Sequence, residues 1–169
     1  MVRKEAWFAK GNLEMSELQV NMNAPDFNLP GSSGASYALT DYHGGPLILY
    51  FYPKDDTSGC TVEGLDFTAL KAEFAALNAK VLGISPDSPQ SHDKFCKKHG
   101  LGIDLASDES KDMLSAYGVW TEKSMYGKKY MGVERTTFLI DKNGVICKIW
   151  NKVKVPNHAA EVLAATKAL

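Results

Sequence analysis

Two short runs of the chain are apolar almost throughout, residues 47–52 ("LILYFY") and residues 80–85 ("KVLGIS"). An unbroken apolar run that ends at a turn residue is typical of a strand buried on both faces of a sheet covered by helices. Shorter stretches at 37–39 and 105–108 favour two further strands, whereas "PGSSGAS" at 30–36 is typical of a loop. The pattern predicts a sheet with a buried centre.

Helical spacing replaces these runs after Cys60. Leu65, Leu70, Phe74 and Leu77 recur near helical spacing and predict one helix over residues 60–78. Three more helices are expected: a short one that ends at Gly100 as a natural C-cap, one over 110–119 with Ser110 or Asp108 near its N-cap, and an amphipathic one over 157–169.

The C-terminal third predicts one hairpin. Segments 135–140 and 145–150 flank "DKNG", and the Asn143-Gly144 pair favours a tight turn between two strands. The polar and aromatic stretch 120–134 is expected to be a loop. Strands that alternate with helices, followed by one hairpin, predict an α/β fold whose sheet is partly parallel and partly antiparallel.

Composition and charge exclude several classes of protein. The 169 residues suffice for one domain with a sizeable core, and the formal net charge of −1 gives no field for nucleic acid or acidic lipid. The longest apolar run is far shorter than the ~18 residues of a membrane helix. Residues 1–14 are mixed in charge, and Met15 resembles a natural start. We expect 1–14 to be a poorly ordered extension, or alternatively a partner-binding arm, and 15–169 to be one domain.

The three cysteines are an odd number at irregular spacing, unlike a secreted disulfide framework. A reducing, cytoplasmic setting is expected, where a cysteine is either buried and quiet or chemically active. Cys60 falls between a buried strand and a helix, where free N–H groups and the helix dipole favour a thiolate. The Thr57 hydroxyl is near enough to donate a hydrogen bond, Pro53 can wall one side, and Gly59 permits close approach. Packing alone remains an equal alternative at this point.

The motif "PKDDTSGCT" resembles the Pro-x-x-x-Thr-x-x-Cys signature of peroxiredoxins, and "FYPKDDTSGCTVEG" is similar to their bacterioferritin-comigratory-protein or PrxQ branch. The resemblance extends from "APDFNLP" through "YGVWTEKSMYGKKYMGVERTTFLIDKNG" to the last helix. It implies a thioredoxin-like fold with a central mixed β-sheet flanked by helices. It also implies a thiol peroxidase for hydrogen peroxide and organic hydroperoxides, recycled by thioredoxin or a similar dithiol, a monomer without cofactor or metal.

The resemblance also implies roles for individual residues. Cys60 is the expected peroxidatic cysteine, which becomes a sulfenic acid. Pro53 shelters its thiolate, and Thr57 hydrogen-bonds the peroxide. Arg135 matches the family's arginine on a later strand and is expected to stabilise the thiolate and the bonds that change. Glu63 either orients Arg135 or caps the helix.

Departures from the family pattern concern the second cysteine. Ser58 replaces a usual proline, and Leu65 stands where many members carry a resolving cysteine. Cys96 matches the resolving position of other members, and neighbouring lysines are expected to favour its thiolate, whereas Cys147 is expected to be structural. A disulfide needs Cα atoms within ~7 Å, so we expect local unfolding before Cys60 and Cys96 join. A one-cysteine cycle with an external thiol and a thioredoxin-like binding or holdase module stay open.

Two further local patterns resemble metal sites, and a third concerns aromatic residues. His92, Cys96 and His99 share one helical face, but the span of an intact helix is too long for one ion to bind all three, so half-exposed histidines are expected. "DKNG" resembles the start of a calcium loop, yet no acidic residue closes it. Trp120 and Tyr126 either line the peroxide entrance or belong to a loop packed over the core.

Overall fold

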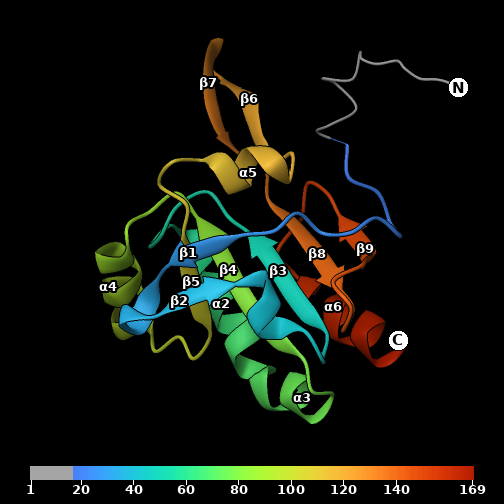
Figure 1. The fold of residues 1–169 in the computed structure, drawn as a ribbon. Helices are drawn as coiled ribbons and strands as arrows, with labels where there is room; N and C mark the ends of the chain where they lie inside the picture. Colours follow the sequence, from blue (N-terminus) through green and yellow to red (C-terminus); the bar gives the residue numbers. More distant parts are fainter. Residues whose placement is uncertain (1–16) are drawn as a thin grey trace, which may run out of the picture.

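The computed structural model describes residues 17–169, so the expected extension 1–14 and its boundary lie outside the described part. A five-stranded sheet in the order β5-β4-β3-β8-β9 forms its centre (Figure 1). β3, β4 and β5 are parallel, whereas β8 is antiparallel to both β3 and β9, which confirms the predicted mixed sheet. The strands are β3 Leu47–Phe51, β4 Lys80–Ser85, β5 Asp104–Ser107, β8 Thr136–Ile140 and β9 Ile146–Trp150.

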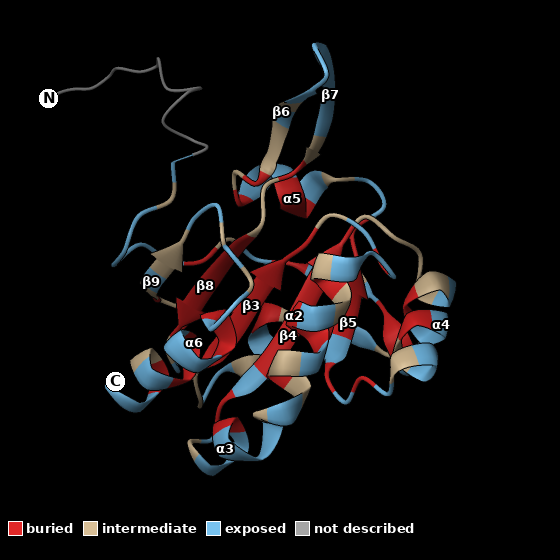
Figure 2. Cartoon of the chain, turned by 180° about the vertical axis from the view of Figure 1, so that it is seen from behind, coloured by how far each residue is buried: buried red, intermediate tan, exposed pale blue. Residues whose placement is uncertain are grey.

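Helices complete the α/β architecture. Figure 2 shows α2 and α6 lying across one face of the sheet, with α4 at the β5 edge. The opposite face carries the short antiparallel pair β1–β2 (Figure 1). The helices are α2 Ser58–Ala69, α3 Lys71–Ala76, α4 Pro89–His99, α5 Asp112–Ala116 and α6 His158–Lys167, and the pair is β1 Asn28–Pro30 with β2 Ser36–Ala38.

β3 is buried on both sides because its side chains alternate between two cores. Leu49 and Phe51 pack into the core on the β1–β2 side, whereas Ile48 and Tyr50 pack into the core under α2 and α6. All five β3 residues are at most 1% exposed. The prediction that this apolar run is a strand buried on both faces is therefore confirmed.

The predicted single helix over 60–78 is wrong, because two helices occupy this span. α2 ends at Ala69, and Leu70 takes a φ of −98° and a ψ of 6° before α3 begins at Lys71. No glycine or proline marks the break, so helical periodicity passes over it. The predicted helix over 110–119 is also shorter, Asp112–Ala116, with Lys111 in the left-handed region at its N-cap.

The stretch 120–134 was predicted to be a loop, and this prediction is wrong. It forms an antiparallel hairpin of β6 Trp120–Met125 and β7 Lys128–Val133, which projects beyond the sheet (Figure 1). The two turn residues, Tyr126 and Gly127, have φ values of 54° and 79°. Positive φ at both turn residues is the geometry of a type I′ hairpin, whose usual signal is Asn-Gly.

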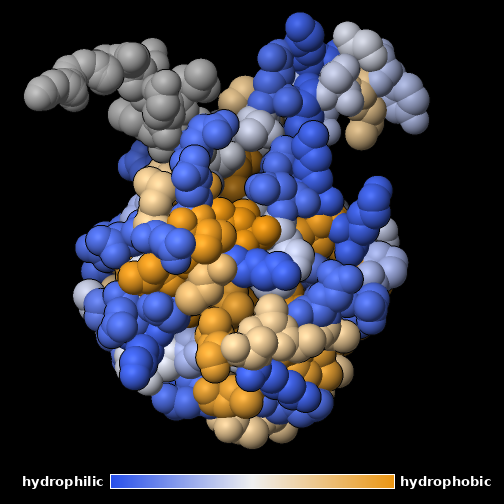
Figure 3. All heavy atoms as spheres, turned by 90° about the vertical axis from the view of Figure 1, so that its right-hand side faces the viewer, coloured by the Kyte–Doolittle hydropathy of each residue, from blue (hydrophilic) through white to orange (hydrophobic). Residues whose placement is uncertain are grey.

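The predicted β8–β9 hairpin is confirmed. Asp141 Oδ1 accepts hydrogen bonds from the backbone N–H groups of Asn143 and Val145, at 2.8 and 3.0 Å, and Gly144 has a φ of 83°. Figure 3 shows apolar side chains gathered in the middle of the face that carries β9 and α6, with hydrophilic side chains around them. No helix within residues 17–169 is long and apolar enough to span a bilayer.

Candidate active site

Cys60 lies in the first turn of α2, just beyond the carboxyl end of β3. α2 begins at Ser58 with Thr57 as its N-cap, and the Cys60 side chain is buried, only 2% exposed. The free N–H groups of a first helical turn favour negative charge at this point. The strand and the helix start that the sequence predicted around Cys60 are therefore both present.

Arg135 reaches Cys60 because β8 pairs with β3. The register places Thr136 opposite Phe51, so Arg135 stands beside the segment that leads from β3 to α2. Its Nη2 donates to the Cys60 sulfur at 3.4 Å, and its Nη1 donates to Glu63 Oε1 at 2.5 Å. The guanidinium thus joins two residues of α2 that are one turn apart.

Glu63 holds Arg135 from inside the protein. Its side chain is 1% exposed, and Oε2 has no hydrogen-bond partner among the described residues. Burial raises the pKa of Glu63 to about 7, and Arg135 acts in the opposite direction. Burial alone lowers the pKa of Arg135, but the charges of Glu63 and Cys60 outweigh this and leave it raised. The Glu63 carboxylate therefore contacts Arg135 rather than the N-terminus of α2.

Three smaller residues precede Cys60 in the loop and the first turn of α2. Thr57 is exposed, and its hydroxyl donates to the carbonyl oxygen of Lys54 at 2.9 Å, so its proton is engaged within the loop. A Cβ added at Gly59 would lie 3.3 Å from Arg135 Nη2, so glycine leaves room for the guanidinium. Pro53 is half-buried at the start of the same loop.

All three cysteines are free thiols. Cys96 is half-buried on α4, and burial raises its pKa to about 11, with Asp55, Asp93 and Asp104 adding to the shift. The prediction that nearby lysines favour a Cys96 thiolate is therefore wrong in this folded arrangement. The sequence shows the lysines beside Cys96, but the fold brings carboxylates to it.

Cys147 is half-buried on β9. Its sulfur lies 3.6 Å from the carbonyl oxygen of Val145, and burial raises its pKa. Among the described residues no hydrogen bond joins Cys147 to Cys60 or Cys96.

One of the two histidines of α4 differs from the prediction. His92 was expected to be half-exposed, which is wrong, because its side chain is fully buried and contacts Asp55. His99 is half-exposed as predicted, and it pairs with Asp56 at the surface end of α4. Within residues 17–169 no group of three or more histidine, cysteine or acidic side chains is arranged to hold a metal ion. Asp55 and Asp56 were not singled out in the sequence, where only the acidic pair in "KDDT" gave a hint.

The aromatic residues considered for the entrance lie elsewhere. Tyr126 occupies the turn of the β6–β7 hairpin and is 97% exposed. Trp120 packs against the core on the β1–β2 side, whereas Cys60 belongs to the core on the other side of the sheet. The structure does not bring these two side chains to Cys60.

Known proteins are similar to this chain in both sequence and fold. The AhpC/TSA family model matches residues 20–149. Peroxiredoxin Bcp of Bacillus subtilis is 47% identical over 89% of this chain and 96% of its own length. Peroxiredoxin Bcp of Xanthomonas campestris is 48% identical over 91% of this chain and 98% of its own length. A cysteine-to-serine mutant of Xylella fastidiosa PrxQ superposes with a TM-score of 0.86 at 42% identity, covering 90% of this chain and 97% of that one.

A thioredoxin-like fold that sets a cysteine at a helix start against a buried Arg–Glu pair defines a class of thiol-dependent peroxidases. The chain belongs to the AhpC/TSA family, and its relatives place it in the Bcp/PrxQ branch of the peroxiredoxins. Members of this family reduce a peroxide with a thiol, and this chain is such an enzyme. The resemblance seen in the sequence is confirmed.

Proposed function

We propose that this peroxiredoxin reduces hydrogen peroxide and organic hydroperoxides through a Cys60 sulfenic acid and a Cys60–Cys96 disulfide, which thioredoxin or a similar dithiol recycles. The observation that carries the proposal is the contact of Arg135 with Cys60, held from behind by Glu63. A permanent positive charge beside the sulfur favours the thiolate, which is the nucleophilic form.

The first step is attack of the Cys60 thiolate on one oxygen of the peroxide. An S–O bond forms as the O–O bond breaks, and the leaving oxygen departs as water or an alcohol after it gains a proton. Negative charge moves from sulfur to the leaving oxygen, and a fixed guanidinium stabilises that charge better than mobile water does. Thr57, at the start of α2, is the proposed hydrogen-bonding partner of the peroxide, and Pro53 shelters the sulfur.

The second step is attack of Cys96 on the sulfenic acid. The structures of known relatives support this assignment of the resolving cysteine. Two solved structures of Xanthomonas campestris PrxQ are cysteine-to-serine mutants, at positions separated by the same number of residues as Cys60 and Cys96. Leu65 cannot serve, because it carries no thiol. The Cys60–Cys96 pairing is the one that this spacing supports.

Organic hydroperoxides enter the proposal through the same relative. A solved structure of the Xanthomonas campestris bacterioferritin comigratory protein is described as giving insight into alkyl peroxide reduction activity, and it is 48% identical to this chain. We further propose that the enzyme works as a monomer in the cytoplasm. Neither nucleic acid nor a membrane is a proposed partner, in keeping with the net charge of −1.

The proposal is tested with two serine variants in a thioredoxin-coupled assay of peroxide consumption. Cys60→Ser should abolish turnover, because no sulfenic acid forms. Cys96→Ser should keep one rapid turnover per protein but lose thioredoxin-dependent cycling. Unchanged cycling by Cys96→Ser would favour a one-cysteine enzyme with an external thiol, and no peroxide consumption by the parent protein would favour a binding module.

A further inference from the structure

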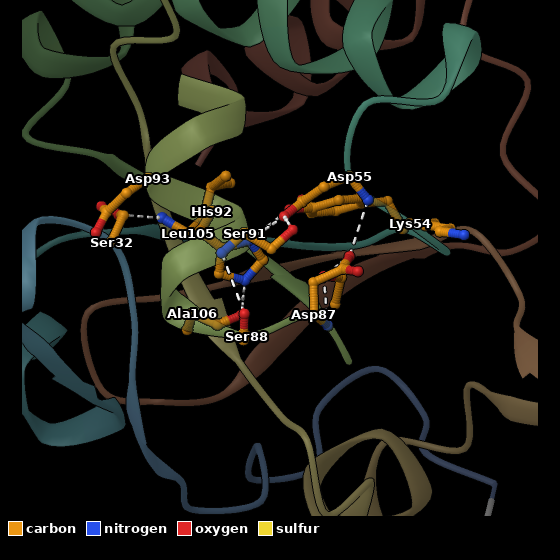
Figure 4. A network of polar contacts seen from close by, with 12 residues as sticks. Ser32, Lys54, Asp55, Asp87, Ser88, Ser91, His92, Asp93, Leu105 and Ala106 are labelled. Atoms are coloured by element: carbon orange, nitrogen blue, oxygen red, sulfur yellow. Dashed lines mark hydrogen bonds and ion pairs between the residues drawn. The ribbon is translucent and has the colours of Figure 1, made fainter. Parts of the chain in front are cut away.

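The loop that precedes Cys60 is fastened to both ends of α4, the helix that carries Cys96. The first fastening is buried and is drawn in Figure 4. The carboxylate of Asp55 accepts hydrogen bonds from the Tyr52 hydroxyl at 2.6 Å and the Ser91 hydroxyl at 2.8 Å, and it pairs with His92 Nδ1 at 2.7 Å. The backbone N–H of Asp55 donates to Asp87 Oδ2 at 2.8 Å.

Both ring nitrogens of His92 face oxygen atoms of other segments. Nδ1 faces the Asp55 carboxylate, and Nε2 lies 3.0 Å from the carbonyl oxygen of Ala106, which only accepts. The His92 and Asp55 side chains are 0% and 4% exposed, so this pair is buried on both sides. Breaking one member of such a pair is far more costly than breaking a surface pair.

The second fastening lies at the surface, at the other end of α4. Asp56 accepts from Lys98 Nζ and from His99 Nε2, both at 2.7 Å. Both hydrogen bonds lower the pKa of Asp56, and the one from His99 contributes more than the one from Lys98. Asp55 and Asp56 thus hold the first turns and the last turn of one helix. We call this set the α4 latch: Asp55, Asp56, His92, Lys98 and His99.

Cys96 lies on α4 between the two fastenings. It is a free, half-buried thiol, and among the described residues it forms neither a disulfide nor a hydrogen bond with Cys60. While α4 is folded, burial and nearby carboxylates raise the Cys96 pKa to about 11. In water a cysteine thiol has a pKa near 8.5, so opening of α4 would both free this sulfur and increase its thiolate fraction.

We propose that the α4 latch controls how fast α4 opens to release Cys96, so that Asp56, Lys98 and the buried His92 are positioning residues for disulfide formation. This inference rests on the proposed role of Cys96 as the resolving cysteine. The latch joins the loop that precedes Cys60 to the helix that carries Cys96. It therefore connects the site of oxidation with the thiol that resolves it. The free energy needed for opening is that of unfolding one helix locally, which is smaller than that of unfolding the whole protein.

The latch decides between two fates of the sulfenic acid. In resolution, the Cys96 sulfur bonds to the Cys60 sulfur, and the hydroxyl of the sulfenic acid leaves with the thiol proton as water. In the competing reaction a second peroxide oxidises the sulfenic acid to a sulfinic acid and is itself reduced to water or an alcohol. Faster opening of α4 favours the disulfide, and slower opening favours the sulfinic acid.

The test compares two lysines of the same helix. Lys98→Gln removes one cation of the latch, whereas Lys97→Gln removes the same charge from the same helical turn. Lys97 makes no ion pair with any residue in the described range. Disulfide formation is timed by rapid quenching and mass spectrometry after one equivalent of peroxide. Lys98→Gln should form the disulfide about two- to fivefold faster than the parent, the range expected for an exposed ion pair, and Lys97→Gln should match the parent.

Hydrogen exchange supplies a readout that a general loss of stability would not reproduce. Amides of residues 90–99 should exchange faster in Lys98→Gln by the same factor as disulfide formation, and amides of α6 should not change. Asp56→Asn weakens the contacts with both Lys98 and His99, so its effect should be at least that of Lys98→Gln. Adding Lys98→Gln to Asp56→Asn should change little further, because the Lys98 pair is already lost. His92→Gln, which breaks the buried pair, should accelerate α4 exchange tenfold or more.

The outcomes separate the latch from the proposed cycle. If the parent protein forms no Cys60–Cys96 disulfide, the assignment of Cys96 fails, and the latch fails with it. If the parent forms the disulfide but Lys98→Gln and Lys97→Gln form it at equal rates, the latch alone is refuted. A faster rate and a higher peroxide concentration for half-conversion to sulfinic acid in Lys98→Gln would support it.

Discussion

At the scale of single residues, the Cys60 sulfur contacts a side chain 75 positions away. Arg135 uses one terminal nitrogen for Cys60 and the other for Glu63, so the guanidinium is held in one orientation. A lysine offers a single charged nitrogen and cannot make both contacts in this fixed geometry. One guanidinium therefore contacts both the Cys60 sulfur and the Glu63 carboxylate.

Replacement of Arg135 tests this directly. Arg135→Gln should lower the second-order rate constant of Cys60 with hydrogen peroxide about 10²–10³-fold, the usual effect of losing one donor to developing negative charge. The rate constant of Arg135→Lys should lie between that of Arg135→Gln and that of the parent. Stopped-flow measurement of peroxide consumption by the reduced protein gives the rates, with Lys142→Gln as a surface control. An Arg135→Gln rate within threefold of the parent would contradict the role assigned to Arg135.

At the scale of elements, the sequence predicted what local pattern determines. The apolar run at 47–52 predicted a strand buried on both faces, and β3 Leu47–Phe51 is one. The C-cap at Gly100 also followed from the sequence, because glycine adopts the left-handed conformation found there, with φ 68°. Burial of His92 did not follow, since it depends on Asp55 and Ala106, which no local spacing connects to α4.

The β6–β7 hairpin shows why a second element was missed. Its turn places Tyr126, a bulky residue, at a positive φ, whereas the recognised signal for this turn is asparagine before glycine. The tertiary framework therefore holds a turn that local propensity disfavours. The Arg135–Glu63 contact was likewise foreseen only as one of two alternatives for Glu63, because strand register rather than sequence spacing brings the two residues together.

Tyr126→Asn should strengthen that turn. Asparagine tolerates positive φ better, and the 97% exposed tyrosine gives up almost no packing. Hydrogen exchange of the β6 and β7 amides should slow about two- to fivefold, while the peroxidase rate stays at the parent value. Faster exchange in Tyr126→Asn would show that the tyrosine side chain itself stabilises the hairpin.

At the scale of the whole molecule, the site lies where the buried sheet meets the core under α2 and α6. His158 at the start of α6 belongs to that region and hydrogen-bonds Thr137 at 2.8 Å. Burial, with a further contribution from Arg135, lowers the pKa of His158 to about 4, from an ordinary value of 6.5. The fold therefore favours the neutral imidazole. Its contribution to stability is present above pH 6.5 and is lost as the pH falls toward 4.

His158→Gln should remove this acid sensitivity. Between pH 7 and pH 4.5 the parent should lose about 2–3 kcal/mol more of its free energy of unfolding than His158→Gln does, as measured by urea titration. Glu63, with its pKa raised to about 7, acts in the opposite sense, but both proteins retain it. Equal losses in the two proteins would contradict a buried neutral His158.

The central claim is that oxidation of Cys60 is resolved by Cys96, which the reduced fold keeps apart and protonated on a latched helix. Peptide mapping by mass spectrometry, after the reduced protein has received one equivalent of hydrogen peroxide, tests it most directly. The account predicts one intramolecular disulfide between the peptides that contain Cys60 and Cys96, with Cys147 still reduced. A link from Cys60 to Cys147, or a sulfinic acid on Cys60 with Cys96 still a free thiol, would contradict it.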